Sequence, residues 1–380
     1  MKVLQILPEL NAGGVERGTL ELARHLVQSG HQSLVVSNGG RLVEQLERLG
    51  SRHITMPVHR KNLASLFQIA PVRRLLELER PNILHIRSRI PGWIAWFAWR
   101  GMDTSQRPRL VSTVHGFNSV NAYSAIMTRG ERVIAVSNSI RDYVVQNYPG
   151  TKPEIIRVIP RGIEPLEYSR NFKPDATWVE TWRKQFSELV GKRVLTLPGR
   201  ITRLKGHEDF LRLIKSLIEG GERVYGLIVG DAHAKKQNYL AEIRSLAAQL
   251  GVAGSVTFTG HRNDLREILA MSEVVFSLST QPESFGRTTL EALALGRPVV
   301  AYDHGGVGEQ LRAIFPAGRV LLRDESALLQ TTRQVLAGVE PPAILPPAYT
   351  LDAMCRTTIE VYSELLHNQP AAGDGNGHAA

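Results

Sequence analysis

The feature that most constrains the fold is a series of short apolar runs, each followed by a helical pattern, that restarts near mid-chain. The runs in the first half are KVLQIL, HQSLVVS, ILHIRS, RLVSTVH and RVIAVS, and those in the second half are RVLTLPGR, YGLIVGD, SVTFTG, VVFSLS and RPVVAYD. Such alternation is typical of a parallel sheet covered by helices on both faces. The sequence therefore predicts two Rossmann-like, doubly wound α/β units in series.

The same pattern suggests where the domains begin and end. We expect an N-terminal domain over 1–165, a linker over 166–190 and a C-terminal domain over 191–348. The Pro-rich stretch PPAILPP precedes a last helix, expected over 349–368 and crossing back to the N-terminal domain. The Gly- and Ala-rich tail, 369–380, is expected to be disordered.

Composition limits the class of protein. The chain has 380 residues, 43% of them apolar, and no apolar run reaches the roughly 18–20 residues of a membrane span. The start resembles a strand rather than a signal peptide. The single cysteine, Cys355, excludes an internal disulfide and a cysteine-based zinc site. We therefore expect a soluble, cytoplasmic protein.

Charge is unevenly distributed between the two halves. Residues 1–165 contain 22 Lys and Arg against 12 Asp and Glu, whereas residues 166–380 contain 24 of each kind. A basic half suggests an anionic partner, such as nucleic acid, a phosphorylated substrate or an anionic membrane surface. The alternative is an ordinary solubilising surface charge.

Two features of the first half lie where a strand ends. Gly13 and Gly14 follow the first apolar run and precede a helix, where backbone amides can approach a phosphate or a sugar. His115 ends the run RLVSTVH and could hydrogen-bond a sugar hydroxyl or stabilise charge at a reacting centre. The alternatives are a tight turn without a ligand and a histidine without a catalytic role.

The second half has the same kind of feature. Arg200 ends RVLTLPGR and Lys205 follows, a pair suited to binding a diphosphate without a metal. In the segment QPESFGRTTLEALALG, Glu283 lies in a loop and Glu291 on the following helix, eight positions apart. Such carboxylates can accept hydrogen bonds from sugar hydroxyls, but they lack the partners of a metal site. Solvated charges would be the alternative for both pairs.

Taken together, these motifs resemble the retaining GT-B glycosyltransferases of family 4 (glycosyl transferases group 1), which use nucleotide-sugar donors. The motifs are the Gly-Gly loop, TVHG, AVSNSIRDYV, VIPRGIE, the Arg200/Lys205 pair and the two glutamates at 283 and 291. The resemblance covers nearly the whole chain. It implies two Rossmann-like domains facing an interdomain cleft, with the acceptor bound by the N-terminal domain and the nucleotide sugar by the C-terminal domain.

The resemblance also implies roles for single residues. Arg200 and Lys205 would hold the donor diphosphate, Glu291 the ribose, and Glu283 the transferred sugar, while His115 would lie near the reacting carbon. The expected catalytic residues are thus His115, Arg200, Lys205 and Glu283. The remaining donor-site residues implied are Gly13, Gly14, Gly260, His261, Arg262, Ser284, Phe285, Gly286 and Thr288.

Some of the reaction follows from the resemblance as well. Retention without an evident protein nucleophile implies that the leaving phosphate helps to deprotonate the acceptor, with no metal and no cofactor. The expected acceptor is a glycan or glycolipid, with lipopolysaccharide core or another cell-envelope polysaccharide as the leading hypothesis. One departure is Arg161, which stands where family members often have Asn.

A possible membrane contact comes from the basic N-terminal half. Trp93, Trp96 and Trp99 fall on roughly one helical face, with Phe97 beside them. They predict either peripheral contact with the anionic cytoplasmic face of an inner membrane or a core helix packed on the sheet.

Other functions are compatible with parts of this sequence. A nucleotide-sugar epimerase, or a glycogen-type synthase or phosphorylase, could use the same fold. A non-enzymatic protein that binds an anionic surface or nucleic acid could use the basic half, but no nucleic-acid-binding module is recognisable. We therefore expect no nucleic acid partner. A catalytically inactive scaffold is disfavoured by the complete set of donor residues.

Overall fold

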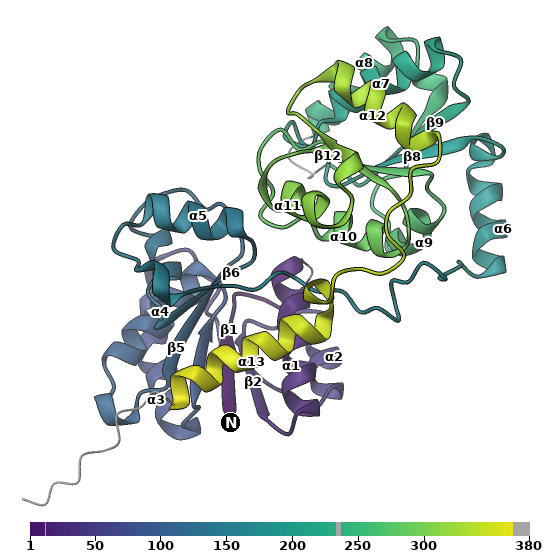
Figure 1. Ribbon diagram of the computed structural model, residues 1–380. Helices are drawn as coiled ribbons and strands as arrows, with labels where there is room; N and C mark the ends of the chain where they lie inside the picture. The colour runs from purple at the N-terminus through teal and green to yellow at the C-terminus, as the bar shows by residue number, and fades with distance from the viewer. Residues whose placement is uncertain (12, 233–236, 368–380) are drawn as a thin grey trace, which may run out of the picture. The chain divides into compact units, whose positions relative to one another are not determined.

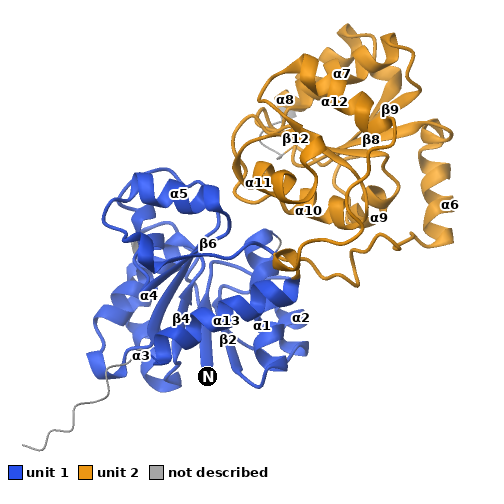
Figure 2. Ribbon diagram, in the orientation of Figure 1, with its two compact units in different colours: residues 1–161, 351–380 blue, residues 162–350 orange. Residues whose placement is uncertain are grey.

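A computed structural model of the protein describes residues 1–11, 13–232 and 237–367. The predicted disordered tail lies outside these residues. The chain divides into two units, coloured separately in Figure 2. Unit 1 comprises residues 1–161 and the chain from residue 351 onward, and unit 2 comprises residues 162–350. Each unit contains one parallel sheet, as the sequence predicted.

The sheet of unit 1 has seven strands in the order β3-β2-β1-β4-β5-β6-β7, all parallel (Figure 1). They are β1 (Lys2–Ile6), β2 (Gln32–Ser37), β3 (Arg52–Thr55), β4 (Ile83–Ile86), β5 (Arg109–Val114), β6 (Arg132–Ala135) and β7 (Ile156–Val158). The strand order reverses between β1 and β4. In open α/β sheets, ligands bind beyond the carboxyl ends of the strands at such a switch point.

Helices connect these strands. They are α1 (Gly14–Gln28), α2 (Val43–Arg48), η1 (Leu63–Gln68), α3 (Ile69–Glu79), α4 (Arg89–Arg100), η2 (Thr104–Gln106), η3 (Ser124–Thr128), α5 (Asn138–Asn147) and η4 (Pro153–Ile155). The last helix, α13 (Leu351–His367), belongs to unit 1. Its Met354, Tyr362 and Leu365 share a core cluster with Val3 and Leu22, so the chain returns to unit 1 at its end.

The sheet of unit 2 has six parallel strands in the order β10-β9-β8-β11-β12-β13. They are β8 (Arg193–Pro198), β9 (Val224–Val229), β10 (Val256–Phe258), β11 (Val274–Ser277), β12 (Val299–Tyr302) and β13 (Arg319–Val320). The order reverses between β8 and β11. The switch point of this unit therefore lies where the loops after β8 and β11 begin.

The helices of unit 2 are α6 (Ala176–Gln185), η5 (Ser187–Leu189), α7 (His207–Glu219), α8 (Gln237–Gln249), η7 (Ala253–Ser255), α9 (Leu265–Ala270), α10 (Arg287–Ala294), α11 (Gly305–Ile314), η8 (Pro316–Gly318), α12 (Glu325–Leu336) and η9 (Pro347–Tyr349). Asp175 caps the N-terminus of α6, because its side chain accepts a hydrogen bond from the Thr177 amide. Trp182 of α6 packs with Phe186, Tyr225 and Leu227 in a buried cluster. Much of the segment expected to be a linker, 166–190, is thus packed into unit 2.

The lengths of the helices bear on membrane insertion. Within residues 1–11, 13–232 and 237–367, no helix is long and apolar enough to cross a bilayer.

Candidate active site

The switch point of unit 2 brings two predicted site residues together. Lys205 lies in the loop after β8 and Glu283 in the loop after β11, and Lys205 Nζ is 2.6 Å from Glu283 Oε1. Both side chains are partly exposed, at 30% and 25% of their surface. Because the carboxyl ends of adjacent parallel strands lie at the same sheet edge, residues 78 positions apart in sequence form this ion pair.

Glu283 is held by more than the lysine. Ser279 Oγ donates a hydrogen bond of 2.5 Å to Glu283 Oε1, and His304 Nε2 donates one of 2.7 Å to the Ser279 carbonyl oxygen. Burial acts to raise the pKa of Glu283, but the Lys205 charge and the hydrogen bonds from Lys205 and Ser279 outweigh it and lower the pKa. The carboxylate is therefore charged at neutral pH and oriented for accepting hydrogen bonds.

The loop after Glu283 is fixed by backbone contacts. Gly286 precedes α10 with φ of 86°, and a Cβ there would lie 2.3 Å from Val307 Cγ2. The amide of Gly306, in the first turn of α11, donates to the Glu283 carbonyl oxygen at 2.7 Å. The buried Gln310 side chain donates to the Phe285 carbonyl oxygen. The close approach to α11 thus requires glycine at 286 and holds the Ser284–Gly286 segment in one conformation.

Glu291 lies on α10, one turn from its start, and is 5% exposed. Its Oε1 is 3.3 Å from Nε of Arg287. Thr288 lies at the beginning of the same helix and is half-buried. A buried carboxylate with an arginine on one side is oriented by that arginine and can accept further hydrogen bonds from hydroxyl groups.

Arg200, two residues after β8, is exposed, and no carboxylate of the described residues lies within 4.0 Å of its guanidinium. It precedes Lys205 in one loop, so two cations emerge beyond the same strand end. Both α10 and α11 also begin beyond this sheet edge, after β11 and β12. Helix N-termini and basic side chains together favour an anion such as a diphosphate.

The third predicted segment, Gly260 to Arg262, lies beyond β10. The Gly260 carbonyl accepts from the Gly230 amide at 3.0 Å, which links the ends of β9 and β10. His261 is exposed, and its Nε2 is 3.2 Å from Asn263 Oδ1. The Arg262 guanidinium is engaged with both carboxylate oxygens of Asp264, at 2.8 and 2.5 Å.

Arg262 also stacks over Trp182, 5.5 Å from the ring centroid. In the strand order, β9 lies between this segment and Lys205, and both β9 and β8 lie between it and Glu283. Arg262 thus serves the packing of α6, whereas Gly260 and His261 remain at the sheet edge.

In unit 1, the predicted residues Gly13 and Gly14 form the start of α1, beyond β1. Gly13 adopts φ of 149°, and a Cβ there would lie 2.4 Å from Glu16 Oε2. Around Gly14 a Cβ would meet nothing within 4 Å. The loop therefore leaves the first amides of α1 sterically accessible, with Glu16 close to them.

His115 follows β5 in the same unit. The Arg161 guanidinium donates to its Nδ1, so the imidazole proton lies on Nε2, which is buried and has no hydrogen-bond partner among the described residues. Burial, followed by the charges of Arg161, Arg87 and His85, holds the pKa of His115 well below its usual value. The ring is neutral at physiological pH and can donate a hydrogen bond through Nε2.

Arg161 and Arg87 add positive charge beside this histidine. Arg87 directly follows β4, is 3% exposed, and donates from Nη1 to Gln5 Oε1 at 2.9 Å. Gly18 makes space for both guanidinium groups, since a Cβ on it would lie 2.5 Å from Arg161 Nη1 and 3.2 Å from Arg87 Nη2. The switch point of unit 1 is therefore lined by arginine and histidine.

Several residues of these sites were not predicted. Ser279 and His304 orient Glu283, and the Gly305–Gly306 pair lets α11 approach the loop. The sequence DHGG after the run RPVVAY has the same order of strand, glycine pair and helix as the segment around Gly13 and Gly14. This pattern could have identified the Gly305–Gly306 pair from the sequence. Arg87 had a similar signal, since it directly follows the run ILHI.

A further feature is the distribution of possible metal ligands in the part of the chain that the structure describes. There, no group of three or more His, Cys, Asp or Glu side chains is placed to hold a metal ion.

Two family models match the chain. The model described as Glycosyltransferase Family 4 matches residues 12–165, and the one described as Glycosyl transferases group 1 matches residues 179–326. Together they cover roughly four-fifths of the chain. The first falls within unit 1 and the start of unit 2, and the second falls within unit 2.

Single proteins agree with the family models. N-acetyl-alpha-D-glucosaminyl L-malate synthase of Bacillus anthracis is 25% identical over 80% of this chain and 79% of its own length. A glycosyltransferase of Rickettsia africae has a crystal structure with a TM-score of 0.81 and 26% identity, covering 97% of this chain and 99% of that one.

HepE of Anabaena, solved in complex with UDP-glucose, has a TM-score of 0.76 and 21% identity, covering 96% of this chain and all of that one. At this identity the likeness concerns the fold alone, and it agrees with the two parallel-sheet units described above. From the two family models and the shared GT-B fold, we conclude that this chain belongs to the group 1 glycosyltransferases of family 4.

Proposed function

We propose that this enzyme transfers a sugar, with retention and without a metal, from a nucleoside-diphosphate sugar to a glycan or glycolipid acceptor. The proposal for the donor rests on the Lys205–Glu283 ion pair at the switch point of unit 2. Arg200 lies in the same loop as Lys205. A cation pair beyond a strand end suits a diphosphate, and a fixed carboxylate suits sugar hydroxyls. HepE, which shares the fold, holds UDP-glucose.

Each residue has a proposed role in this reaction. Arg200 and Lys205 neutralise the diphosphate as charge develops on it, and Glu283 accepts hydrogen bonds from the transferred sugar. Glu291 accepts from the ribose hydroxyls, and the amides of Phe285 and Gly286 donate to the sugar or the phosphate.

Entry of the donor must change the ion pair at the switch point. A diphosphate at Lys205 competes with Glu283 for the same ammonium group, which has three hydrogens to donate. We infer that Lys205 turns partly towards the phosphate, and that Ser279 then keeps the Glu283 carboxylate in place.

The bond changes follow from the retaining outcome. The bond from the sugar anomeric carbon to the phosphate oxygen breaks, and a bond from that carbon to the acceptor oxygen forms on the same face. The acceptor proton passes to the leaving phosphate, so no protein nucleophile is needed. His115 of unit 1, a neutral Nε2–H donor, is proposed to hydrogen-bond the transferred sugar.

The acceptor is proposed to be part of the cell envelope, with lipopolysaccharide core as the leading candidate. Support comes from the basic residues 1–165 and from the arginines at the switch point of unit 1, which favour a phosphorylated or acidic acceptor. We further propose that the enzyme works at the cytoplasmic face of the membrane that carries this acceptor.

A screen of donors by thermal shift tests the proposal. We expect one among UDP-, GDP-, ADP- and dTDP-sugars to raise the Tm of the wild type and to be slowly hydrolysed. Glu291→Ala should lose this stabilisation, whereas Glu219→Ala, which removes an exposed carboxylate paired with Lys215 on α7, should keep it. A wild type that responds to none of these donors would contradict the proposed function.

A further inference from the structure

Helix α4 of unit 1 presents an aromatic cluster at the surface. Trp93 and Trp96 pack edge to face with ring centroids 5.6 Å apart, and Trp93 stacks with Phe97 at 5.5 Å. Phe97 is 41% exposed. The predicted stripe of three tryptophans divides here, because Trp99 Nε1 donates to the Pro108 carbonyl oxygen at 2.7 Å and lies apart from the cluster.

Two arginines stack on this cluster. The guanidinium groups of Arg100 and Arg129 lie 4.8 and 4.6 Å from the ring centroid of Trp96. Both arginines are exposed, and no carboxylate of the described residues lies within 4.0 Å of either. Stacking on a ring leaves the guanidinium edges able to bind an anion.

The chain segment that contains α4 carries almost no negative charge. Residues 82–130 contain six arginines and a single acid, Asp103. The next acid along the chain, Glu131, is paired with Arg109 at 3.2 Å. We call the surface formed by Trp93, Trp96, Phe97, Tyr123, Arg100 and Arg129 the aromatic–arginine face.

Exposed apolar side chains also lie on η1, which packs beside α4, as α3 does. Phe67 of η1 is 79% exposed, and its neighbour Leu66 is 51% exposed. Lys61 and Arg74 flank them and are exposed too. Exposed aromatic and aliphatic residues among unpaired basic ones are typical of surfaces that insert at a membrane interface.

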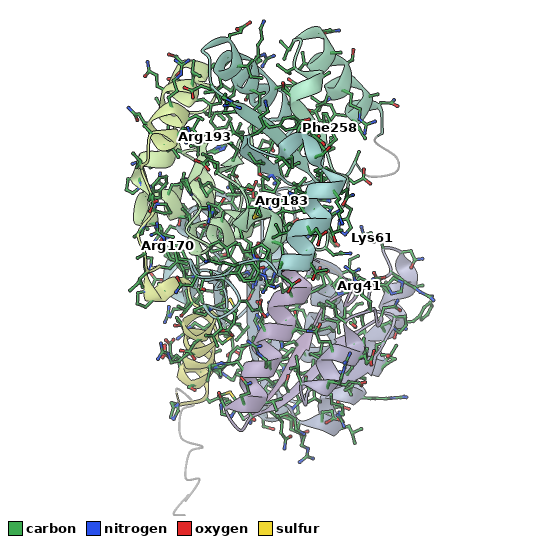
Figure 3. All side chains as sticks on the ribbon, turned by 90° about the vertical axis from the view of Figure 1, so that its right-hand side faces the viewer. Arg41, Lys61, Arg170, Arg183, Arg193 and Phe258 are labelled. Carbon is green, nitrogen blue, oxygen red and sulfur yellow. The ribbon has the colours of Figure 1, made fainter. Side chains whose placement is uncertain are left out.

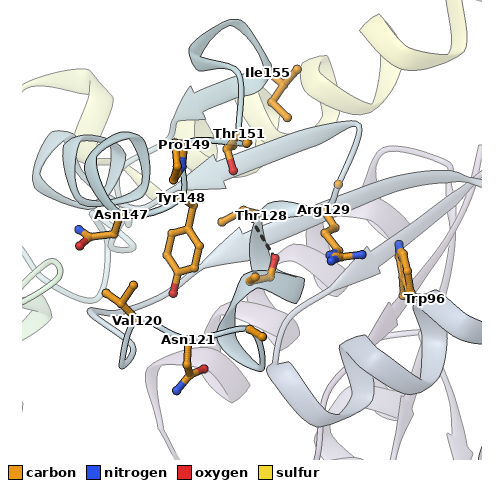
Figure 4. Close-up of a pocket in the computed structure, with 14 residues that line it drawn as sticks. Trp96, Val120, Asn121, Thr128, Arg129, Asn147, Tyr148, Pro149, Thr151 and Ile155 are labelled. Carbon is orange, nitrogen blue, oxygen red and sulfur yellow. Dashed lines mark hydrogen bonds between the residues drawn. The ribbon is translucent and has the colours of Figure 1, made fainter.

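A groove opens next to Arg129, between η3 and the segment that follows α5 (Figure 4). Its volume is about 690 Å³, and its lining includes Trp96, Arg129, Asn121 and Tyr148. One cation with amide and hydroxyl groups around it suits a phosphate-bearing headgroup.

We propose that the aromatic–arginine face docks on an anionic lipid bilayer, with a lipid phosphate headgroup in the groove beside Arg129. The arginines would bind phosphates, and Phe67, Phe97 and the tryptophans would enter the interface between headgroups and acyl chains. The docking proposal rests on the proposed function, because its role would be to bring unit 1 to an acceptor carried by a lipid.

Cosedimentation of the full chain with vesicles tests the proposal. We expect binding to vesicles of phosphatidylglycerol and phosphatidylcholine, weakened by salt, and much weaker binding to phosphatidylcholine alone. The double variant Arg100→Glu/Arg129→Glu should lower the partition coefficient by roughly tenfold or more. Phe67→Ser, at a largely exposed side chain, should weaken binding without affecting the fold.

Arg183→Glu provides the matched control, because Arg183 is an exposed arginine on α6 of unit 2 (Figure 3). It should bind vesicles as the wild type does. The double variant changes the net charge by four units and Arg183→Glu by two, so a loss of binding free energy in Arg183→Glu that is half or more of the loss in the double variant would reduce the effect to net charge and overturn the proposal. A wild type that does not bind anionic vesicles, or that prefers duplex DNA at equal salt, would overturn it as well.

Donor binding separates this proposal from the proposed function. The double variant should keep the Tm increase with whichever nucleotide sugar stabilises the wild type, since both arginines lie in unit 1. Loss of vesicle binding together with loss of that Tm increase would indicate misfolding of the variant, and Phe67→Ser then decides. Unchanged vesicle binding in Phe67→Ser would contradict the docking of this face.

Discussion

The two units share one architecture but differ in the chemistry of their switch points. In unit 2, the loops after β8 and β11 place a lysine and a glutamate 2.6 Å apart, so the charges compensate each other. In unit 1, the loops after β4, β5 and β7 supply Arg87, His115 and Arg161, and Arg87 donates to the neutral side chain of Gln5. Similar backbones thus hold a lysine–glutamate ion pair in one unit and arginines beside a neutral histidine in the other.

This difference indicates what each site can bind. A lysine–glutamate pair offers a cation for a phosphate and an acceptor for sugar hydroxyls, which matches a nucleotide sugar. Arginine side chains beside a neutral histidine offer hydrogen-bond donors, which match an anionic partner. The fold therefore does not decide the function of a unit, and the residues at its strand ends do.

The largest effect should come from removing the cation of unit 2. Lys205→Ala should lower kcat/KM by about 100-fold to 1,000-fold, because charge developing on the leaving diphosphate loses a fixed counter-charge. Steady-state kinetics with the identified donor measures this. The exposed Lys184, 2.7 Å from Glu180, offers a similar pair outside the site, and Lys184→Ala should turn over normally. Normal turnover by Lys205→Ala would contradict the assignment of the site.

A smaller effect is expected from the backbone of the glutamate loop. Gly286 and Gly221 both have φ of 86°, but a Cβ would collide with Val307 only at Gly286. Gly221→Ala should cost about 1 kcal/mol from backbone strain alone, and Gly286→Ala about 3 kcal/mol or more. Urea unfolding measures both. Equal losses would mean that the contact with α11 does not fix this loop.

The smallest effect concerns how the stability of the fold depends on pH, and it should differ between the titratable residues of the two units. In the folded chain the pKa of His115 is lowered. Below about pH 6.5 the unfolded chain therefore takes up a proton at this residue while the folded chain does not. As a result, the stability of the fold decreases as the pH is lowered. His115→Gln should reduce this loss by roughly 1 kcal/mol between pH 6.5 and 5.5. Chemical unfolding at both pH values measures it.

Glu283 in unit 2 should behave differently. Its folded pKa is also lowered, but as an acid it stabilises the fold above its ordinary pKa of 4.5, and this stability is lost only as pH falls through the lower folded value. Glu283→Gln should therefore lose as much unfolding free energy between pH 6.5 and 5.5 as the wild type does. The charge states described here would be contradicted if Glu283→Gln reduced the loss of stability between pH 6.5 and 5.5, or if His115→Gln did not reduce it.

The sequence predicted the fold well because apolar runs and helical periodicity are local signals. β1, β8 and α13 lie within the segments expected for them. The short strands β3 and β13 were not predicted from the sequence, because few residues in each are apolar. The boundary at residue 162 and the packing of α6 depend on tertiary contacts of Trp182 and Phe186, which no local pattern reveals.

The site was predicted in part. Lys205 and Glu283 were identified as separate features, but their ion pair depends on the strand order β8-β11, which the sequence does not give. Arg262 was expected in the donor site, and the structure pairs its guanidinium with Asp264. Charge and strand position indicated a basic residue at a loop, whereas in the structure Asp264 engages its guanidinium and also accepts a hydrogen bond from Trp178 Nε1 of α6 at 2.8 Å.

Hydrogen exchange with a nucleoside diphosphate bound tests the central claim most directly, namely that the switch point of unit 2 holds the donor. Comparison of the free and the bound enzyme by mass spectrometry would locate the protected amides in each unit. We predict that protection includes residues 199–206, 279–286 and 304–306, beyond β8, β11 and β12. Protection confined to unit 1, around Gly13 and His115, with no change in those three segments would contradict it.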